Sequence, residues 1–334
     1  MKKHLIIFGP VEEFHTFQKF NAFLYSIKKD YDKISAVVFE KSIGIISEAD
    51  ELLIISNNFL DSKNANYPTI LENMVNRDIS DYKESTLITI KEKYPNSEIL
   101  FYNYLTIKDE HNNIYFPWYS VSNVEDSFKR DVKLVRNWLD DKNLLYPSQS
   151  SLDVFETNYK EIVNENTFIF ITRNFKNKQE WSNTHLHYPQ TKDFIQFLLN
   201  KGYYVLNIGY PPSNFDVDVN HETGKYQELF PDFNQDVLFS LFMKAKGVFS
   251  FTSGLFVNVC SYANILKLEI EFLPVWDTGE TFIDVKKRID DIQSIDLIEE
   301  YNKHDFKSIY EKIKDLTPPK KIKTSKSQKI NYLI

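Results

Sequence analysis

Cationic side chains follow a short apolar segment near the middle of the chain, where they could hold an anionic ligand. Residues 167–172 are rich in branched and aromatic side chains and predict a buried strand, and Arg173 comes directly after it. A guanidinium presents its N–H groups as a planar fork that matches phosphate oxygens. The loop that follows contributes further candidate contacts, namely Asn174, Lys176 and His187. The alternative is a solvated loop in which Arg173 pairs with a nearby carboxylate.

A second candidate for anion binding lies at residues 248–255, where a strand, a tight turn and a helix are predicted. Thr252 and Ser253 would supply hydroxyl donors, and Gly254 would let a phosphate approach the backbone. Unpaired N–H groups at a helix start bind phosphates readily. The alternative is an ordinary serine N-cap on a buried helix. Gly209 ends another predicted strand, so three strand ends would converge on one pocket if the strands are neighbours.

Acid–base chemistry would come from the first half of the chain, where Glu12, Glu13 and His15 follow the turn at residues 9–10. Helical spacing places Glu12 and His15 on one side of the predicted helix. A carboxylate or imidazole there could take the proton of an attacking hydroxyl group. The alternative is a solvated first turn in which acidic residues are favoured by the helix dipole.

Alternating strands and helices must position these residues. The first half predicts strands at 5–8, 36–39, 52–55 and 99–102, with helices at 11–28, 43–48, 85–93 and 125–139. The second half predicts strands at 167–172, 203–208, 248–251 and 268–272, with helices at 190–199, 236–245, 255–266, 284–300 and 306–316. This pattern is typical of parallel sheets with covered faces. The polar segment 140–151 predicts a domain boundary.

We therefore expect an α/β fold with two Rossmann-like doubly wound domains that face a cleft. The expected domains are residues 1–150 and 151–316, followed by a flexible, lysine-rich tail at 317–334.

Composition narrows the function classes. The 334 residues are 42% hydrophobic and carry a net charge of -7 without a strongly basic half, so no nucleic-acid partner is expected. The single Cys260 excludes an intramolecular disulfide, and no apolar segment is long enough for a signal peptide or a membrane span, which predicts a cytoplasmic protein. Dinucleotide-binding, P-loop, HExxH and GxSxG motifs are absent from the sequence. The two Asp-x-Asp pairs, at 30–32 and 216–218, are what chance provides, so no metal is expected.

The order of these features resembles the C-terminal half of a family of bacterial surface-polysaccharide glycosyltransferases that is similar to GT-B-type transferases. The resemblance spans residues 167–274 and is carried by Thr-Arg-Asn at 172–174, the glycine-ended strand at 202–209 and Thr-Ser-Gly-Leu at 252–255. It implies a nucleotide-sugar donor held by the second domain, an acceptor held by the first, and no cofactor. The bulky Phe249 and Phe251 depart from the small residues that are commoner there, and the first half has no glycine-rich loop beyond Gly9.

The expected function is therefore sugar transfer from a nucleotide-sugar donor to a cell-surface glycan or a lipid-linked acceptor. A pyruvyl or other group transferase acting on glycans stays open, as does a non-catalytic subunit that binds a sugar nucleotide or glycan. The tail lysines could hold the chain at the inner face of an anionic membrane, or could simply be solvated. They are Lys320, Lys321, Lys323, Lys326 and Lys329.

Overall fold

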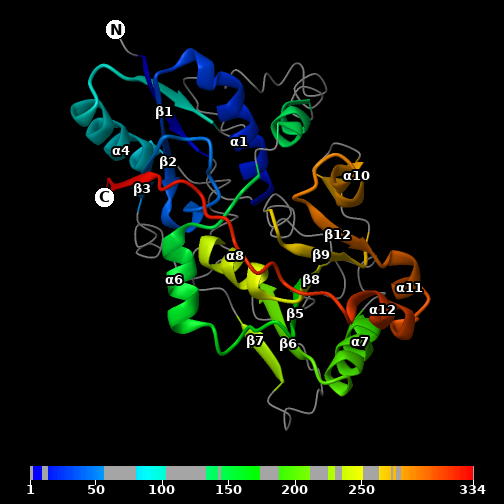
Figure 1. Ribbon diagram of the computed structural model, residues 1–334. Coiled ribbons are helices and arrows are strands. Elements are labelled where there is room, and N and C mark those ends of the chain that lie inside the picture. The colour runs from blue at the N-terminus through cyan, green and yellow to red at the C-terminus, as the bar shows by residue number, and fades with distance from the viewer. Residues whose placement is uncertain are drawn as a thin grey trace. The chain divides into compact units, whose positions relative to one another are not determined.

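The computed structural model divides the chain into two compact units, each built around its own sheet (Figure 1). It describes residues 3–9, 14–55, 80–102, 133–141, 144–173, 188–210, 225–229, 235–250, 263–271, 274–275 and 280–333. The first unit comprises Met1–Asn143 and Lys326–Ile334, and the second comprises Leu144–Ser325.

The first unit contains a parallel sheet of strand order β13-β3-β2-β1-β4. Its strands are β1 (His4–Phe8), β2 (Lys33–Phe39), β3 (Glu51–Ile55), β4 (Glu98–Phe101) and β13 (Lys329–Tyr332). Its helices include α1 (Phe14–Ile27) and α4 (Ser80–Lys93), with short 3-10 helices η1 (Lys28–Asp30) and η2 (Glu40–Ser42). Apart from β13, the strands have the order of one half of a Rossmann fold.

Burial explains why these segments form strands and helices. Every residue of β3 is buried, as expected for a parallel strand with both faces covered. On one face Ile6, Val37 and Leu53 pack with Ile90 of α4. From α1, Phe20 and Leu24 are fully buried, at the spacing of one helical turn.

The second unit has a parallel sheet of order β12-β9-β8-β5-β6-β7. Its strands are β5 (Thr167–Arg173), β6 (Tyr204–Tyr210), β7 (Tyr226–Leu229), β8 (Gly247–Ser250), β9 (Leu266–Glu269) and β12 (Gln293–Asp296). A separate antiparallel pair joins β10 (Pro274–Val275) and β11 (Glu280–Thr281). Counted along this unit alone, the strand order is 6-5-4-1-2-3, which is the complete Rossmann order with its reversal between β5 and β8.

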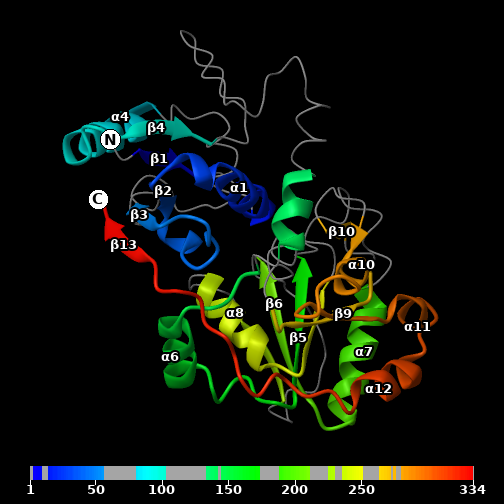
Figure 2. The same ribbon diagram turned by 45° about the horizontal axis from the view of Figure 1, so that its top comes forward.

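Helices cover both faces of the second sheet (Figure 2). One face packs against α7 (Tyr188–Asn200), α11 (Ile298–Asn302) and α12 (Phe306–Ile313). The buried Phe170, Phe249 and Leu268 of the sheet meet Phe194 of α7 and Tyr301 of α11. The other face carries α8 (Gln235–Lys244), which contacts α6 (Gln149–Asn158), while α10 (Phe282–Lys286) contacts β12. The predicted α/β class with two Rossmann-like doubly wound sheets is therefore confirmed.

Two predicted helices are wrong. Residues 43–48 form a turn, because the Asn21 side chain forms hydrogen bonds with the backbone of this segment. Its Nδ2 donates to Ile45 O at 2.7 Å, and its Oδ1 accepts from Ser47 N at 2.9 Å. Residues 284–300 do not form one helix either, because β12 pairs with the edge of β9 and separates α10 from α11. The apolar residues of 284–300 have helix-like spacing, so the sequence predicted a helix where β12 forms an edge strand.

The unit boundary falls inside the predicted boundary segment 140–151, whereas the chain end differs from our expectations. The division falls at Asn143 and Leu144, and Ser148, expected in a linker, caps α6 by accepting a hydrogen bond from Ser151 N at 3.1 Å. The expected flexible tail instead ends in β13, which pairs with β3 and belongs to the first unit. Lys329 Nζ lies 3.2 Å from an oxygen of the fully buried Glu51, so a buried charge helps to hold the chain end.

Candidate functional site

The candidate site lies at the reversal of strand order in the second sheet. In open parallel sheets, ligands bind outside the carboxyl ends of the strands at such a reversal, because the loops leave in opposite directions and open a crevice. Here the reversal lies between β5 and β8, where Ile171 is the register partner of Ser250. On the other side of β5, Thr172 pairs with Gly209 and Arg173 pairs with Tyr210.

The structure brings three predicted strand ends together. Arg173 is the last residue of β5, Gly209 lies near the end of the neighbouring β6, and β8 ends at Ser250, shortly before the Thr-Ser-Gly sequence. The sequence predicted convergence of these strand ends only if the strands are neighbours, and the structure shows that they are. The remaining donor-side candidates lie outside the described residues: Asn174, Lys176, His187, Thr252, Ser253 and Gly254. Their roles stay predictions.

Glu269 is a residue at this edge that the sequence analysis missed. It is the last residue of β9 and the register partner of Ser250, so it lies one strand away from the reversal. It is fully buried, and its Oε1 accepts a hydrogen bond from the Ser294 hydroxyl. Its Oε2 is also buried and has no hydrogen-bond partner in the described part of the chain. The available signal was a glutamate inside the apolar run Leu-Glu-Ile at 268–270.

Burial controls the charge of Glu269. Removal from water, aided by the nearby Asp296, raises the pKa of its carboxyl group to about 7, although the Ser294 bond and Lys267 lower it. Carboxyl groups with such shifted pKa values are common at functional sites. Glu269 can therefore gain or lose a proton near neutral pH.

The acid–base candidates of the first half lie at the carboxyl end of β1. Glu12 and Glu13 are outside the described residues, and His15 lies in the first turn of α1. Gly9 precedes them where space is limited, since a Cβ atom added there would lie 2.8 Å from Val38 Cγ1. This sheet reverses its order between β1 and β4, so β1, which precedes His15 and α1 in the chain, borders a reversal.

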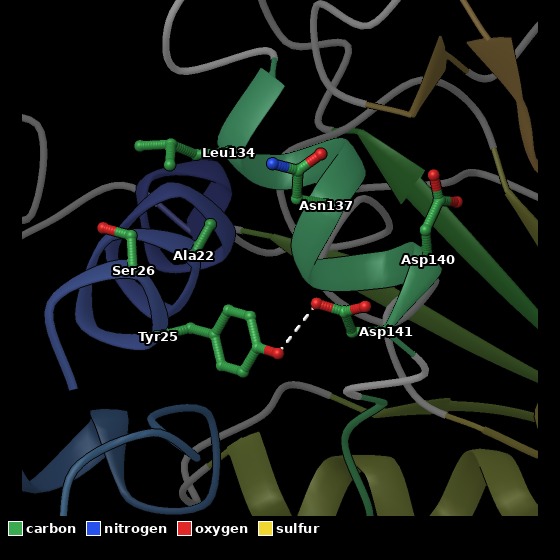
Figure 3. Close-up of a pocket in the computed structure, with 7 residues that line it drawn as sticks. All are labelled: Ala22, Tyr25, Ser26, Leu134, Asn137, Asp140 and Asp141. Carbon is green, nitrogen blue, oxygen red and sulfur yellow. Dashed lines mark hydrogen bonds between the residues drawn. The ribbon is translucent and has the colours of Figure 1, made fainter. Parts of the chain in front are cut away.

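A pocket of about 220 Å³ opens in the first unit between α1 and the helix at 133–140 (Figure 3). Tyr25 points across it, and its hydroxyl group donates to Asp141 Oδ2 at 2.7 Å. The described residues that line it are Ala22, Tyr25, Ser26, Leu134, Asn137, Asp140 and Asp141. Carboxylate, amide and hydroxyl groups could bind a polar ligand, but none of these residues belongs to the predicted site.

Two properties bear on cofactors and membranes. Among the residues that the structure describes, no three His, Cys, Asp or Glu side chains are grouped so that they could hold a metal ion. Residues 216–218, which contain one Asp-x-Asp pair, lie outside those residues. Within the same described ranges, no helix combines the length and the apolar character needed to cross a membrane.

Comparison with known proteins gives distant structural likenesses only. No protein-family model and no curated protein matches the chain. The heptosyltransferase WaaC of E. coli, solved with ADP, has a TM-score of 0.48 and 11% identity, covering 93% of this chain and 99% of its own. The ADP-heptose heptosyltransferase II of E. coli has a TM-score of 0.45 and 10% identity, covering 80% and 84%. A family 9 glycosyl transferase from Veillonella parvula has a TM-score of 0.43 and 10% identity, covering 88% and 86%.

These TM-scores lie below 0.5. The fold class therefore rests on this chain's own strand order, and its activity has to rest on its own residues.

Proposed function

We propose that the chain is a glycosyltransferase that moves a sugar from a nucleotide-sugar donor to a cell-surface glycan or a lipid-linked acceptor without a metal ion. One observation carries the proposal: Arg173 ends β5 at the strand-order reversal, beside β8, whose following turn has the Thr-Ser-Gly sequence suited to a diphosphate. The second unit is the proposed donor side, and the first is the proposed acceptor side.

The proposed chemistry is departure of a nucleoside diphosphate from the anomeric carbon of the sugar. Negative charge develops on the leaving oxygen, so groups that bind it more strongly as the charge grows lower the barrier. Arg173 and the backbone N–H groups at Ser253 and Gly254 are the proposed contacts, with Asn174, Lys176, His187, Gly209 and Thr252 around them. Glu12, Glu13 or His15 would take the proton of the acceptor hydroxyl group.

The chain end supports a further part of the proposal. Lys320, Lys321 and Lys326 are exposed, while Lys323 lies 3.4 Å from Asp291 and Lys329 pairs with Glu51. Each lysine near an anionic lipid surface contributes up to about 1 kcal/mol. We include peripheral contact with the inner face of the membrane through these exposed lysines as part of the proposed function.

Two other functions are distinguished by the same experiment. A pyruvyl transferase would respond to phosphoenolpyruvate and not to nucleotides. A non-catalytic subunit would bind a sugar nucleotide without hydrolysing or transferring the sugar.

A thermal-shift panel of UDP, GDP, CMP and ADP sugars tests the proposal. A ligand that binds only the folded state stabilises it, by about 2.7 kcal/mol at a hundred times its dissociation constant. We expect one nucleotide class to raise the melting temperature and to be consumed when an acceptor glycan is added. A panel in which no nucleotide changes the melting temperature would overturn the proposal.

A further inference from the structure

The carboxyl group of Glu269 is buried with only one of its two oxygens satisfied. Oε1 accepts from the Ser294 hydroxyl, and Oε2 has no partner among the described residues. A buried carboxylate oxygen without a donor is costly, whereas a protonated carboxyl group can itself donate a hydrogen bond. Burial of the Glu269 carboxyl group is therefore less costly when it is protonated.

Glu269 also lies where an anion is proposed to bind. Its register partner is Ser250, and neighbouring strands lie about 4.8 Å apart. Ser250 ends β8, which borders the strand-order reversal and precedes the Thr-Ser-Gly sequence. The backbone of Glu269 is fixed as well, because its carbonyl oxygen accepts from Leu297 N at 2.9 Å.

The charged groups around Glu269 are of both signs. Lys267 is buried on the same strand, and its Nζ donates to Ile265 O at 3.0 Å. β12 contributes Asp296, and α10 contributes Asp284 and Lys286, whose Nζ donates to Ser294 O at 2.7 Å. Both aspartates raise the pKa of Glu269 and Lys267 lowers it, with burial the largest effect. With its pKa at about 7, Glu269 therefore has similar populations of the protonated and deprotonated forms near neutral pH.

We propose that an anionic ligand binds beside β8 together with one proton, which Glu269 Oε2 takes up so that the anion lies near a neutral carboxylic acid instead of a carboxylate. This inference rests on the proposed function, because it takes a nucleoside diphosphate as the anion. The proton comes from solvent, forms the O–H bond at Oε2, and returns to solvent when the ligand leaves. Glu269 Oε2 is enclosed by protein, so it acts on the anion through space: a carboxylate would repel the anion, and a neutral acid does not.

The consequence is a ligand affinity that depends on pH. Below the pKa of Glu269 the proton is already present and affinity is constant. Above about pH 7 each bound ligand must bring the proton, so affinity falls by up to about tenfold per pH unit. Nucleoside diphosphates are themselves fully ionised well above their pKa of about 6, so their own titration does not cause a change in that range.

Isothermal titration of the full chain with UDP, GDP and ADP in turn tests this inference. The binding enthalpy is measured at about pH 8 in Tris and in HEPES, whose different ionisation enthalpies reveal the number of protons taken up. We expect uptake that approaches one proton per nucleotide in the natural chain and none in Glu269→Gln. The matched control Glu271→Gln removes a half-exposed carboxylate two residues away and should keep the uptake.

Ser294→Ala provides a second variant that keeps the Glu269 carboxyl group. Loss of the hydroxyl donor raises the pKa of Glu269 further, so proton uptake should begin at a higher pH than in the natural chain. Nucleotide binding without proton uptake, or with equal uptake in Glu269→Gln, overturns the inference and leaves the donor site intact. If no nucleotide binds the natural chain at any pH, the inference and the proposed function both fail.

Discussion

Ile171 of β5 and Ser250 of β8 are register partners at the point where the strand order of the second sheet reverses. These strands are far apart in sequence, and their adjacency brings the end of β5, at Arg173, close to the end of β8, at Ser250. Parallel pairing places both carboxyl ends at the same edge of the sheet. One ligand at this edge of the sheet can therefore reach the segments that follow β5 and β8.

The first prediction concerns Arg173. In Arg173→Ala the melting-temperature rise produced by the active nucleotide should disappear, because loss of a charge-assisted, bidentate contact costs about 1.5–3 kcal/mol or more. Arg173→Lys keeps the charge but not the planar fork, so it should restore only part of the rise. The measurement is a thermal shift with and without nucleotide.

Arg288→Ala is the matched control, because Arg288 is the other arginine of the second half and pairs with Glu280 at 2.9 Å. It should keep the full nucleotide response. An Arg173→Ala variant that responds like Arg288→Ala would remove Arg173 from the donor site.

The second prediction concerns stability and Glu269 in the absence of ligand. Its pKa is raised from 4.5 to about 7, so the folded state binds more protons between these values and stability falls as pH rises through that window. The full cost above the window is roughly 3 kcal/mol. Glu269→Gln should be more stable than the natural chain at pH 8 and nearly equal at pH 4.5, as measured by denaturant unfolding. An unchanged difference across this range would contradict the assignment.

The third prediction concerns the ion pairs that hold β13. Glu51 lies 2.6 Å from Lys33 Nζ and 3.2 Å from Lys329 Nζ. Burial raises the pKa of Glu51, but hydrogen bonds from Lys33, Ser35 and Lys329 outweigh burial and lower the pKa below its usual value. Lys33→Met should cost about 2 kcal/mol. Lys329→Met should cost less, because Lys329 Nζ lies farther from the carboxylate and its side chain is more exposed than that of Lys33.

Lys326→Met is the matched control for Lys329→Met. It removes one positive charge from the same chain end, at an exposed position, and should change stability little. Since the pKa of Glu51 is lowered, the stability that its partners supply is present above its unfolded value of 4.5 and is lost as pH falls. The Lys33→Met deficit should therefore shrink in acid. Equal effects of Lys33→Met and Lys326→Met on unfolding would contradict this account of the chain end.

The fourth prediction concerns Gly9. A Cβ atom there would lie 2.8 Å from Val38 Cγ1 and 3.2 Å from Phe20 Cε1, and both side chains are buried. Gly9→Ala should therefore destabilise the first unit by about 1–3 kcal/mol through overpacking. Nucleotide affinity should remain unchanged if the donor site lies in the second unit. Denaturant unfolding and nucleotide titration of the same variant check both statements.

Segments with strong local patterns were predicted well. The strand expected at 167–172 is β5, and the helix expected at 190–199 lies within α7. Both bury large apolar side chains, such as Phe168 and Phe194, so their periodicity reports the core directly. By contrast β12 and β13 are short, polar edge strands. Their conformation comes from pairing with β9 and β3, which no local pattern reveals.

The α/β alternation and the placement of Arg173 at a strand end could be read from local patterns, because both follow from which side chains must leave water. The folded chain was needed to show that β5 lies next to β8, that the last residues return to the first unit, and that Glu269 is buried with one oxygen unsatisfied. Strand adjacency and the pKa of a buried acid depend on groups distant in the chain, and local sequence carries no record of those distances.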